Sequence, residues 1–249
     1  MPKNKVRADI LVVEQGLAPT RSKAQALILA GSIVTLDGMR IDKAGTALES
    51  SVELRLKGEP LRYVSRGGIK LEEALKEFQV DPTGRIAMDV GSSTGGFTDC
   101  LLQHGAAKVY AVDVGSNQLA WSLRSDVRVV SLEKTNIRTM PPTSIAEPVS
   151  IIVADVSFIS LELILAPTLA VAAPGCEVVM LVKPQFEVGR GEVGKGGIVR
   201  SPQARLGTVQ KIASLFRELN LEGVQWIDSP IAGAKGNQEF LLYGVVPGG

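Results

Sequence analysis

The chain has 249 residues, of which 45% are hydrophobic and 21% charged, and its formal net charge is +1. That length suffices for a full α/β core with a small additional domain. The longest apolar stretch, residues 163–173, is interrupted by Pro167 and Thr168 and is too short to cross a bilayer. No apolar run with a cleavage site follows the basic residues 1–7, so we expect a cytoplasmic protein without a signal peptide.

Cysteine and histidine are scarce in this chain. Cys100 and Cys176 lie in apolar patterns and are expected in the core. His104 follows a predicted helix and is expected to interact with its C-terminus. There is no C-x-x-C or H-E-x-x-H spacing and no G-x-S-x-G elbow, so we expect neither a metal site nor a Ser-His-Asp triad.

Positive charge is concentrated near the N-terminus. Residues 1–70 contain 12 Lys and Arg against 7 Asp and Glu, whereas residues 71–249 contain 15 against 19. This asymmetry indicates a polyanionic partner for the N-terminal segment.

Residues 6–58 have the pattern of a separate small domain. Helices are predicted over 8–15 and 21–30, with Thr20 capping the second. Strands are predicted near 33–36 and 52–56, with an Asp37-Gly38 turn after the first.

The sequence of this segment resembles a known RNA-binding module. The runs R-A-D-I-L-V-V-E-Q-G-L-A and T-R-S-K-A-Q-A-L-I-L-A-G-S-I-V-T-L-D-G are similar to the module first seen in ribosomal small-subunit protein four. The resemblance implies that phosphate contacts come from Arg7, Arg21, Lys23 and Lys43, which position RNA without reading its sequence. A solvated basic helix face is the alternative. The predicted division is residues 1–58 for this domain, 59–65 for a linker and 66–249 for the second domain.

Ser65-Arg66-Gly67-Gly68-Ile69-Lys70-Leu71 opens the second domain. It leads into a helix with Leu71, Ala74, Leu75 and Phe78 on its core face, and Ser65 is a candidate cap. Lys70 lies at the helix start, where a cation gains nothing from the helix dipole. Its position indicates either a functional lysine or a surface lysine.

A strand, a glycine loop and a helix follow. Residues 86–90 are a predicted strand containing Asp89, the loop reads G-S-S-T-G-G, and a helix starts near Phe97. The loop differs from the dinucleotide-binding pattern G-x-G-x-x-G. An acid before such a loop suits a cationic sulfonium and amino-acid ligand better than a pyrophosphate. The alternative is a loop that only turns a strand into a helix.

Asp113 ends the next predicted strand, 22 residues after Gly91, where an acid can accept hydrogen bonds from ribose hydroxyls. A solvated strand-end carboxylate is the other interpretation. Together the two features resemble the S-adenosylmethionine site of class I methyltransferases. The resemblance implies cofactor contacts from Asp89, Gly91, Ser92, Ser93, Thr94, Gly95, Gly96, Phe97, Asp113 and Asp155, with an adenine ring near residues 133–136.

From residue 85 onward, strands and helices alternate, which predicts an α/β fold with a mostly parallel sheet, helices on both faces and an antiparallel last strand. The glycine-rich residues 189–197 are expected to be mobile and to close over substrate. Strands are predicted at 109–112, 127–130, 150–154, 177–182, 223–228 and 240–245, and helices at 117–123, 161–172 and 201–219.

Asp155 and Lys183 each follow an apolar strand, and ligands of open α/β sheets bind beyond such strand ends. An ion pair that merely closes the sheet edge is the alternative. Lys70 and Glu239 are expected in the same neighbourhood. Lys70, Asp155, Lys183 and Glu239 match the K-D-K-E tetrad of FtsJ-type ribose 2′-O-methyltransferases.

The segments S-R-G-G-I-K-L, D-V-G-S-S-T-G-G-F-T-D, A-D-V-S-F-I-S-L, K-P-Q-F-E and G-N-Q-E-F together resemble the TlyA-type subfamily, also called hemolysin A. The resemblance implies methylation of a ribose 2′-hydroxyl, typically of cytidine, in ribosomal RNA, with S-adenosyl-L-methionine as cofactor. It also implies ribosomal RNA or ribosomal subunits as partners and a role for Arg66 in RNA binding. No membrane or DNA partner is expected, and the oligomeric state stays open.

A lysine accepts the proton of a ribose hydroxyl only if burial or a neighbouring cation lowers its pKa. We therefore hypothesise that Lys183 is the base or proton-orienting group, with Lys70 as the neighbouring cation. Asp155 and Glu239 would orient the two lysines, with Asp155 near the transferred methyl group. The alternatives are an RNA-binding assembly factor without turnover and a membrane-active lysin. A lysin requires an amphipathic or spanning segment, which the sequence lacks.

Overall fold

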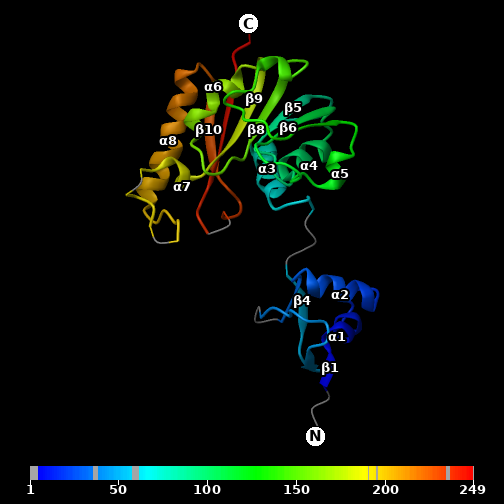
Figure 1. The fold of residues 1–249 in the computed structure, drawn as a ribbon. Helices are drawn as coiled ribbons and strands as arrows, with labels where there is room; N and C mark the ends of the chain where they lie inside the picture. Colours follow the sequence, from blue (N-terminus) through cyan, green and yellow to red (C-terminus); the bar gives the residue numbers. More distant parts are fainter. Residues whose placement is uncertain are drawn as a thin grey trace. The chain divides into compact units, whose positions relative to one another are not determined.

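The computed structural model describes residues 5–35, 39–57, 62–189, 191–194, 196–233 and 236–248. The chain divides into two compact units, Met1–Leu61 and Arg62–Gly249, each of which is described by itself (Figure 1).

The N-terminal unit packs two helices against two short antiparallel strand pairs. The pairs are β1 with β3 and β2 with β4. Both helices and the Thr20 cap, whose hydroxyl accepts from the Lys23 N–H at 3.3 Å, match the sequence prediction. Strands β1 and β3 were not predicted, and the Asp37-Gly38 turn lies outside the described residues. The bounds are β1 Lys5–Arg7, α1 Ala8–Glu14, α2 Arg21–Leu29, β2 Ile33–Thr35, β3 Ala47–Glu49 and β4 Leu54–Leu56.

A fully buried carboxylate, Asp9, organises one side of this unit. It accepts hydrogen bonds from Arg7, Arg21 and Gln25 at 2.7–3.0 Å. The Arg7 hydrogen bond, together with those from Gln25 and Arg21, holds the pKa of Asp9 well below its usual range. The side chains of Arg7 and Arg21 remain about half exposed, at 47% and 54%.

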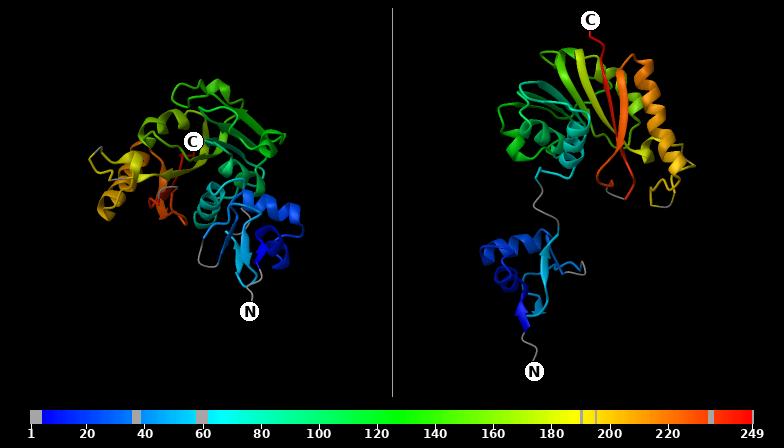
Figure 2. Two further views of the ribbon diagram at one scale, coloured as in Figure 1. Left: turned by 60° about the horizontal axis from the view of Figure 1, so that its bottom comes forward. Right: turned by 180° about the vertical axis from the view of Figure 1, so that it is seen from behind.

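The second unit contains a seven-stranded sheet in the order β10-β11-β9-β8-β5-β6-β7 (Figures 1 and 2). The five strands from β9 to β7 are parallel, and β11 is antiparallel to both of its neighbours. The α/β prediction with an antiparallel last strand is therefore confirmed. The bounds are β5 Ile86–Val90, β6 Lys108–Val112, β7 Val129–Leu132, β8 Val149–Ala154, β9 Ala172–Val182, β10 Glu222–Asp228 and β11 Phe240–Val245.

Helices cover both faces of this sheet because side chains alternate along each buried strand. In β5, Met88 belongs to the cluster that includes Phe216 of α8, and Ala87 to the cluster that includes Leu71 of α3. Helices α6 and α8 pack on the first face, and α3, α4 and α5 on the second (Figure 2). The bounds are α3 Gly67–Glu77, α4 Gly96–Gln103, α5 Trp121–Arg124, η1 Pro142–Ser144, η2 Leu161–Leu163, α6 Leu165–Leu169, α7 Pro184–Glu187 and α8 Pro202–Glu218.

Several element boundaries differ from the sequence prediction. The helix predicted over 161–172 is wrong as one element: it is split into η2 and α6, and β9 already begins at Ala172. The helix predicted over 117–123 is reduced to α5, because Asn117 adopts a φ of +57°. Strand β7 lies two residues beyond its prediction, after a turn in which Asp126 accepts from the Arg128 N–H.

Ser65 does not cap α3, since no side-chain hydrogen bond caps this helix. His104, in contrast, ends α4 as expected, with Nδ1 2.8 Å from the Cys100 carbonyl oxygen. Both cysteines are buried and free, also as expected. In the described part of the chain, no helix has the length and apolarity needed to cross a membrane.

Candidate active site

The site lies where the sheet topology reverses direction. From β5 the chain runs to β6 and β7 on one side, and β8 then pairs with β5 on the other side. In open α/β sheets, ligands bind at such a switch point, beyond the carboxyl ends of the strands. The residues that follow β5, β8 and β9 form the walls of this crevice.

The glycine loop between β5 and α4 is packed too tightly for side chains at key positions. Gly91 has a φ of +80°, and a Cβ there would lie 2.8 Å from the Asp155 carbonyl oxygen. Gly95, the N-cap of α4, has a φ of +98°. A Cβ at Gly96 would lie 3.0 Å from the Gly68 backbone nitrogen. The glycines thus let the loop approach the segment after β8 and the start of α3 closely.

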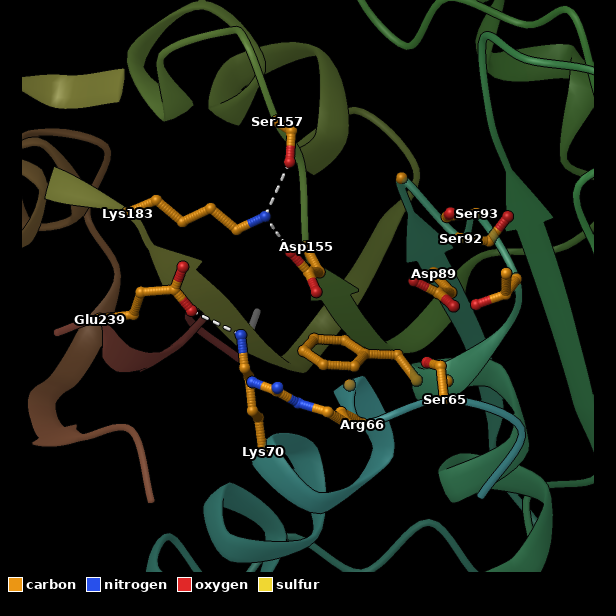
Figure 3. Close-up of a pocket in the computed structure, with 15 residues that line it drawn as sticks. Ser65, Arg66, Lys70, Asp89, Ser92, Ser93, Asp155, Ser157, Lys183 and Glu239 are labelled. Carbon is orange, nitrogen blue, oxygen red and sulfur yellow. Dashed lines mark hydrogen bonds and ion pairs between the residues drawn. The ribbon is translucent and has the colours of Figure 1, made fainter. Parts of the chain in front are cut away.

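Asp89 is fully buried beneath this loop (Figure 3). Its Oδ2 accepts from the Thr98 N–H at 2.9 Å and from the Thr98 hydroxyl at 2.7 Å. Its Oδ1 has no hydrogen-bond partner, although Asp89 lines the crevice. Burial raises the pKa of Asp89 to about 7, and the charges of Asp155 and Asp113 act in the same direction. A cationic ligand group would satisfy this orphaned oxygen.

Asp113 holds the other side of the loop. Its carboxylate accepts from the Ser93 N–H at 2.8 Å and from the Gly115 N–H at 2.7 Å. Asp113 is therefore not simply a solvated strand-end carboxylate, because both oxygens fix backbone turns. Each oxygen retains a second lone pair for an incoming hydroxyl.

Four charged side chains from distant parts of the sequence line one pocket of about 380 Å³ (Figure 3). Lys70 Nζ lies 2.5 Å from Glu239 Oε2, and Lys183 Nζ lies 2.5 Å from Asp155 Oδ1. Lys183 also donates to the Ser157 hydroxyl at 2.9 Å. The expectation that Lys70 and Glu239 lie in the neighbourhood of Asp155 and Lys183 is therefore confirmed.

The local environment separates these lysines from ordinary surface residues. Lys70 is only 7% exposed, so its interpretation as a surface lysine is wrong. The Lys183–Asp155 ion pair does form at the sheet edge, but both side chains also line the pocket. The pocket therefore contains two ion pairs, Lys70 with Glu239 and Lys183 with Asp155.

A second pocket of about 370 Å³ adjoins the first and shares Gly91, Ser93, Asp155 and Ser157 with it. Its wall includes Asp113 and several apolar side chains. Thr135 and Asn136 also line it, which is the segment that the sequence placed near an adenine ring. The two pockets together accommodate an elongated ligand with one apolar end and one charged end.

The roles of Ser157 and Phe158 and the contact made by Arg66 were not identified from the sequence. Ser157 is a partner of Lys183, and its position two residues after Asp155 was the available signal. Phe158 is 91% exposed with a φ of +65°, and its ring packs against Phe186 with centroids 5.2 Å apart. Arg66 donates to the Ala232 carbonyl oxygen at 2.7 Å while lining the first pocket.

The remaining candidate residues lie elsewhere. Arg7, Arg21, Lys23 and Lys43 belong to the N-terminal unit and are exposed. Residues 189–197 are only partly described, and their expected mobility stays a prediction. Among the described residues, no three His, Cys, Asp or Glu side chains are arranged to hold a metal ion.

The strand order, the glycine loop with its buried acid and the charged pocket define a class I methyltransferase fold. Residues 63–245 match the FtsJ-like methyltransferase family, and residues 6–54 match the S4 domain. The chain belongs to the FtsJ-like methyltransferase family and carries an N-terminal S4 domain.

Relatives cover nearly the whole chain. A Bacillus subtilis protein, provisionally named an rRNA methyltransferase, is 50% identical over 100% of this chain and 88% of its own. The Mycobacterium tuberculosis 16S/23S rRNA (cytidine-2′-O)-methyltransferase TlyA is 45% identical over 96% of this chain and 89% of its own. A solved Streptococcus thermophilus structure, provisionally named a hemolysin, has a TM-score of 0.76 at 44% identity and covers 98% of this chain and 90% of its own.

Proposed function

We propose that this protein transfers a methyl group from S-adenosyl-L-methionine to the ribose 2′-hydroxyl of a cytidine in ribosomal RNA. The observation that carries the proposal is the convergence of two lysine–carboxylate pairs on one pocket beside the glycine loop. The names of relatives at 45–50% identity support the same reaction.

The residues of the two pockets fit this cofactor. The orphaned Oδ1 of Asp89 offers an acceptor to the cationic methionine part, and the close approach of Gly91 to the Asp155 carbonyl oxygen fixes the loop that would hold it. Asp113 would accept the ribose hydroxyls, and the apolar wall around Ile137 would enclose the adenine. When bound, the cofactor supplies an electrophilic methyl group on a sulfonium.

The chain's own task is then to align and deprotonate a hydroxyl group. Methyl transfer forms a carbon–oxygen bond, breaks a carbon–sulfur bond and releases the hydroxyl proton. We propose that Lys183 is the base or proton-orienting group, fixed by Asp155 and Ser157. Lys70, fixed by Glu239, supplies the second cation of the pocket. Positioning and proton transfer are effects that such groups contribute in other enzymes.

Two features support an RNA substrate. The N-terminal unit presents exposed basic side chains on an S4 domain, suited to phosphate contacts that position without reading sequence. Phe158 exposes an aromatic ring at the wall of the second pocket, and exposed aromatic rings stack bases of single-stranded RNA. We propose residues 1–58 as the RNA-binding domain, 59–65 as the linker and 66–249 as the methyltransferase domain. A ribosomal substrate would place the activity in the cytoplasm.

The test is transfer of a tritiated methyl group to purified small and large ribosomal subunits, followed by mapping of the modified nucleotides. We expect incorporation at a cytidine 2′-oxygen, and none into sequence-matched DNA. Liposome leakage is measured in parallel. RNA binding without incorporation on either subunit would contradict the enzyme and favour an assembly factor, and leakage without incorporation would favour a lysin.

A further inference from the structure

A buried asparagine joins two segments of the methyltransferase unit that are distant in sequence. Asn237 is only 2% exposed. Its Oδ1 accepts from the Val199 N–H at 2.9 Å, and its Nδ2 donates to the Gly197 carbonyl oxygen at 2.8 Å. The amide therefore satisfies one main-chain donor and one main-chain acceptor at once, which requires a side chain with both functions.

In the first of these segments, main-chain hydrogen bonds join Gly194 to Gly197 and Ile198. The Gly194 N–H donates to the Ile198 carbonyl oxygen at 3.0 Å, and the Gly197 N–H donates to the Gly194 carbonyl oxygen at 3.0 Å. Val199 follows with only 1% exposure. The bonds from Asn237 thus attach Gly197 and the buried Val199 to the segment before β11.

The second segment is the turn between β10 and β11 that leads to Glu239. The Ser229 N–H donates to the Glu239 carbonyl oxygen at 2.9 Å, and the Gly233 N–H donates to the Asn237 carbonyl oxygen at 2.9 Å. A Cβ at Gly233 would lie 2.3 Å from Glu239 Oε1, so this turn packs directly on the carboxylate. Movement of the turn would therefore move the group that holds Lys70.

We propose that Asn237 is a positioning residue: by tying residues 197–199 to the turn before β11, it holds the Glu239 carboxylate against Lys70. Asn237 itself lines neither pocket of the site. Its effect on methyl transfer rests on the proposed function, whereas its effect on the turn rests only on the contacts above. Loss of the Asn237 amide would leave the Val199 N–H and the Gly197 carbonyl oxygen without this hydrogen-bond partner, which lowers the free energy of unfolding.

The test compares Asn237→Ala with Gln238→Ala. Gln238 lies on the same turn, and its amide nitrogen donates to the Ser229 and Glu239 carbonyl oxygens. Hydrogen exchange is followed at the Ser229 and Gly233 amides, which do not bond to the Asn237 side chain. We expect Asn237→Ala to speed exchange at both amides about tenfold or more, and Gln238→Ala to leave the Gly233 amide within about threefold of wild type.

The second arm measures single-turnover methyl transfer and cofactor affinity. Asn237→Ala is expected to lower the rate constant about 10- to 100-fold and to leave the cofactor Kd within about twofold. Equal losses in rate and cofactor affinity, or unchanged exchange at the Ser229 and Gly233 amides, would overturn the positioning role. If the wild-type protein transfers no methyl group, the proposed function fails, and the exchange arm still decides whether Asn237 fixes the turn.

Discussion

Lys70 and Glu239 form a buried ion pair across 169 positions of sequence, with Nζ and Oε2 2.5 Å apart. Their side chains are only 9% and 3% exposed. A charge in such a place is tolerated because its partner is present. This pair therefore links the start of α3 to the start of β11. Because both residues also line the pocket, a substitution of either one is expected to change both the stability of the protein and its activity.

Removal of one member of this pair is expected to destabilise the protein more than removal of both. Lys70→Met leaves the Glu239 carboxylate buried and unpaired, which costs about 3 kcal/mol, whereas the double variant Lys70→Met/Glu239→Gln leaves no unpaired charge. Urea unfolding measures the free energy of unfolding of the single and the double variant. Lys76→Met is the control on the same helix, because Lys76 is 70% exposed and its ion pairs are screened by solvent, so its loss should leave the stability close to that of wild type. A double variant no more stable than Lys70→Met would contradict this account.

Lys183→Ala is expected to abolish methyl transfer while leaving cofactor binding largely intact. The Lys183 side chain contacts Asp155 and Ser157 rather than the glycine loop. Its loss therefore removes the proposed proton acceptor but leaves the loop that is proposed to bind the cofactor. We expect at least about a 100-fold lower rate with a cofactor Kd within about threefold. Lys211→Ala, which removes an exposed pair with Glu162, is the matched control and should keep full activity. Substantial turnover by Lys183→Ala would exclude Lys183 from this role.

Gly91→Ala is expected to weaken cofactor binding through its contact with the Asp155 carbonyl oxygen. Gly84 is a matched control, because its φ of +69° is similar to the +80° of Gly91 but a Cβ there would meet nothing within 4 Å. Both alanine variants bear the cost of a left-handed backbone, about 1 kcal/mol. Only Gly91→Ala should lose cofactor affinity, by about tenfold or more, in equilibrium titration. Equal affinities for the two variants would show that the close approach at Gly91 does not shape the cofactor site.

Asp89→Asn is expected to stabilise the cofactor-free protein at pH 8 more than at pH 5. The pKa of Asp89 is raised by burial from 3.8 to about 7, so the folded state binds a proton more tightly than the unfolded state. Stability is then lost as the pH rises from about 4 to about 7, and the neutral amide avoids this loss. The pH 8 gain should exceed the pH 5 gain by about 2 kcal/mol, seen as several degrees in Tm.

The same substitution removes the anion that faces the cationic ligand, so cofactor affinity should fall although stability rises. Thr98→Val serves as a second variant, because it removes the hydroxyl that donates to Asp89 Oδ2 but retains the carboxylate. A thermal shift in Asp89→Asn that does not depend on pH would contradict the linkage.

Lys23→Ala is expected to weaken binding to ribosomal RNA without changing sequence preference. Lys23 is exposed on α2, and as a proposed RNA-binding residue it would contact phosphate rather than a base edge. The slope of log K against log salt should become shallower by about one unit. Lys108→Ala, which removes a lysine paired with Glu147 in the other unit, should leave the slope unchanged. An unchanged slope in Lys23→Ala would remove this residue from the RNA-binding surface.

The elements with strong local signals were predictable from the sequence. Strand β5 has the predicted bounds because five apolar or buried residues end at a glycine. Helix α8 lies where the helix over 201–219 was predicted, and it begins at Pro202 because the Ser201 side chain caps it. Helix α6 was mispredicted because the apolar run before β9 has no glycine or charge to mark where helix ends and strand begins. The periodicity of apolar residues alone does not distinguish a helix from a strand in a short apolar segment.

In the candidate site, too, some features were predictable from the sequence and others were not. Asp155 and Lys183 were predictable because each follows a buried strand, and topology rules place such residues at one edge. Asp155 and Glu239 were expected to orient the two lysines, but the sequence did not indicate which carboxylate binds which lysine. The structure pairs Lys70 with Glu239 and Lys183 with Asp155. Side-chain partners depend on how α3 packs against the sheet, and sequence spacing carries no information on that packing. Phe158 escaped notice because its significance lies in its exposure and backbone conformation.

Strand β11 is inserted between β9 and β10, although it is made after both of them. During synthesis, the sheet therefore keeps a gap until residues 240–245 leave the ribosome, and the last charged side chain of the pocket arrives immediately before them. A nascent chain lacks this strand and with it the counter-ion of Lys70. We therefore expect the pocket to stay incomplete, and methyl transfer to be absent, until β11 has entered the sheet.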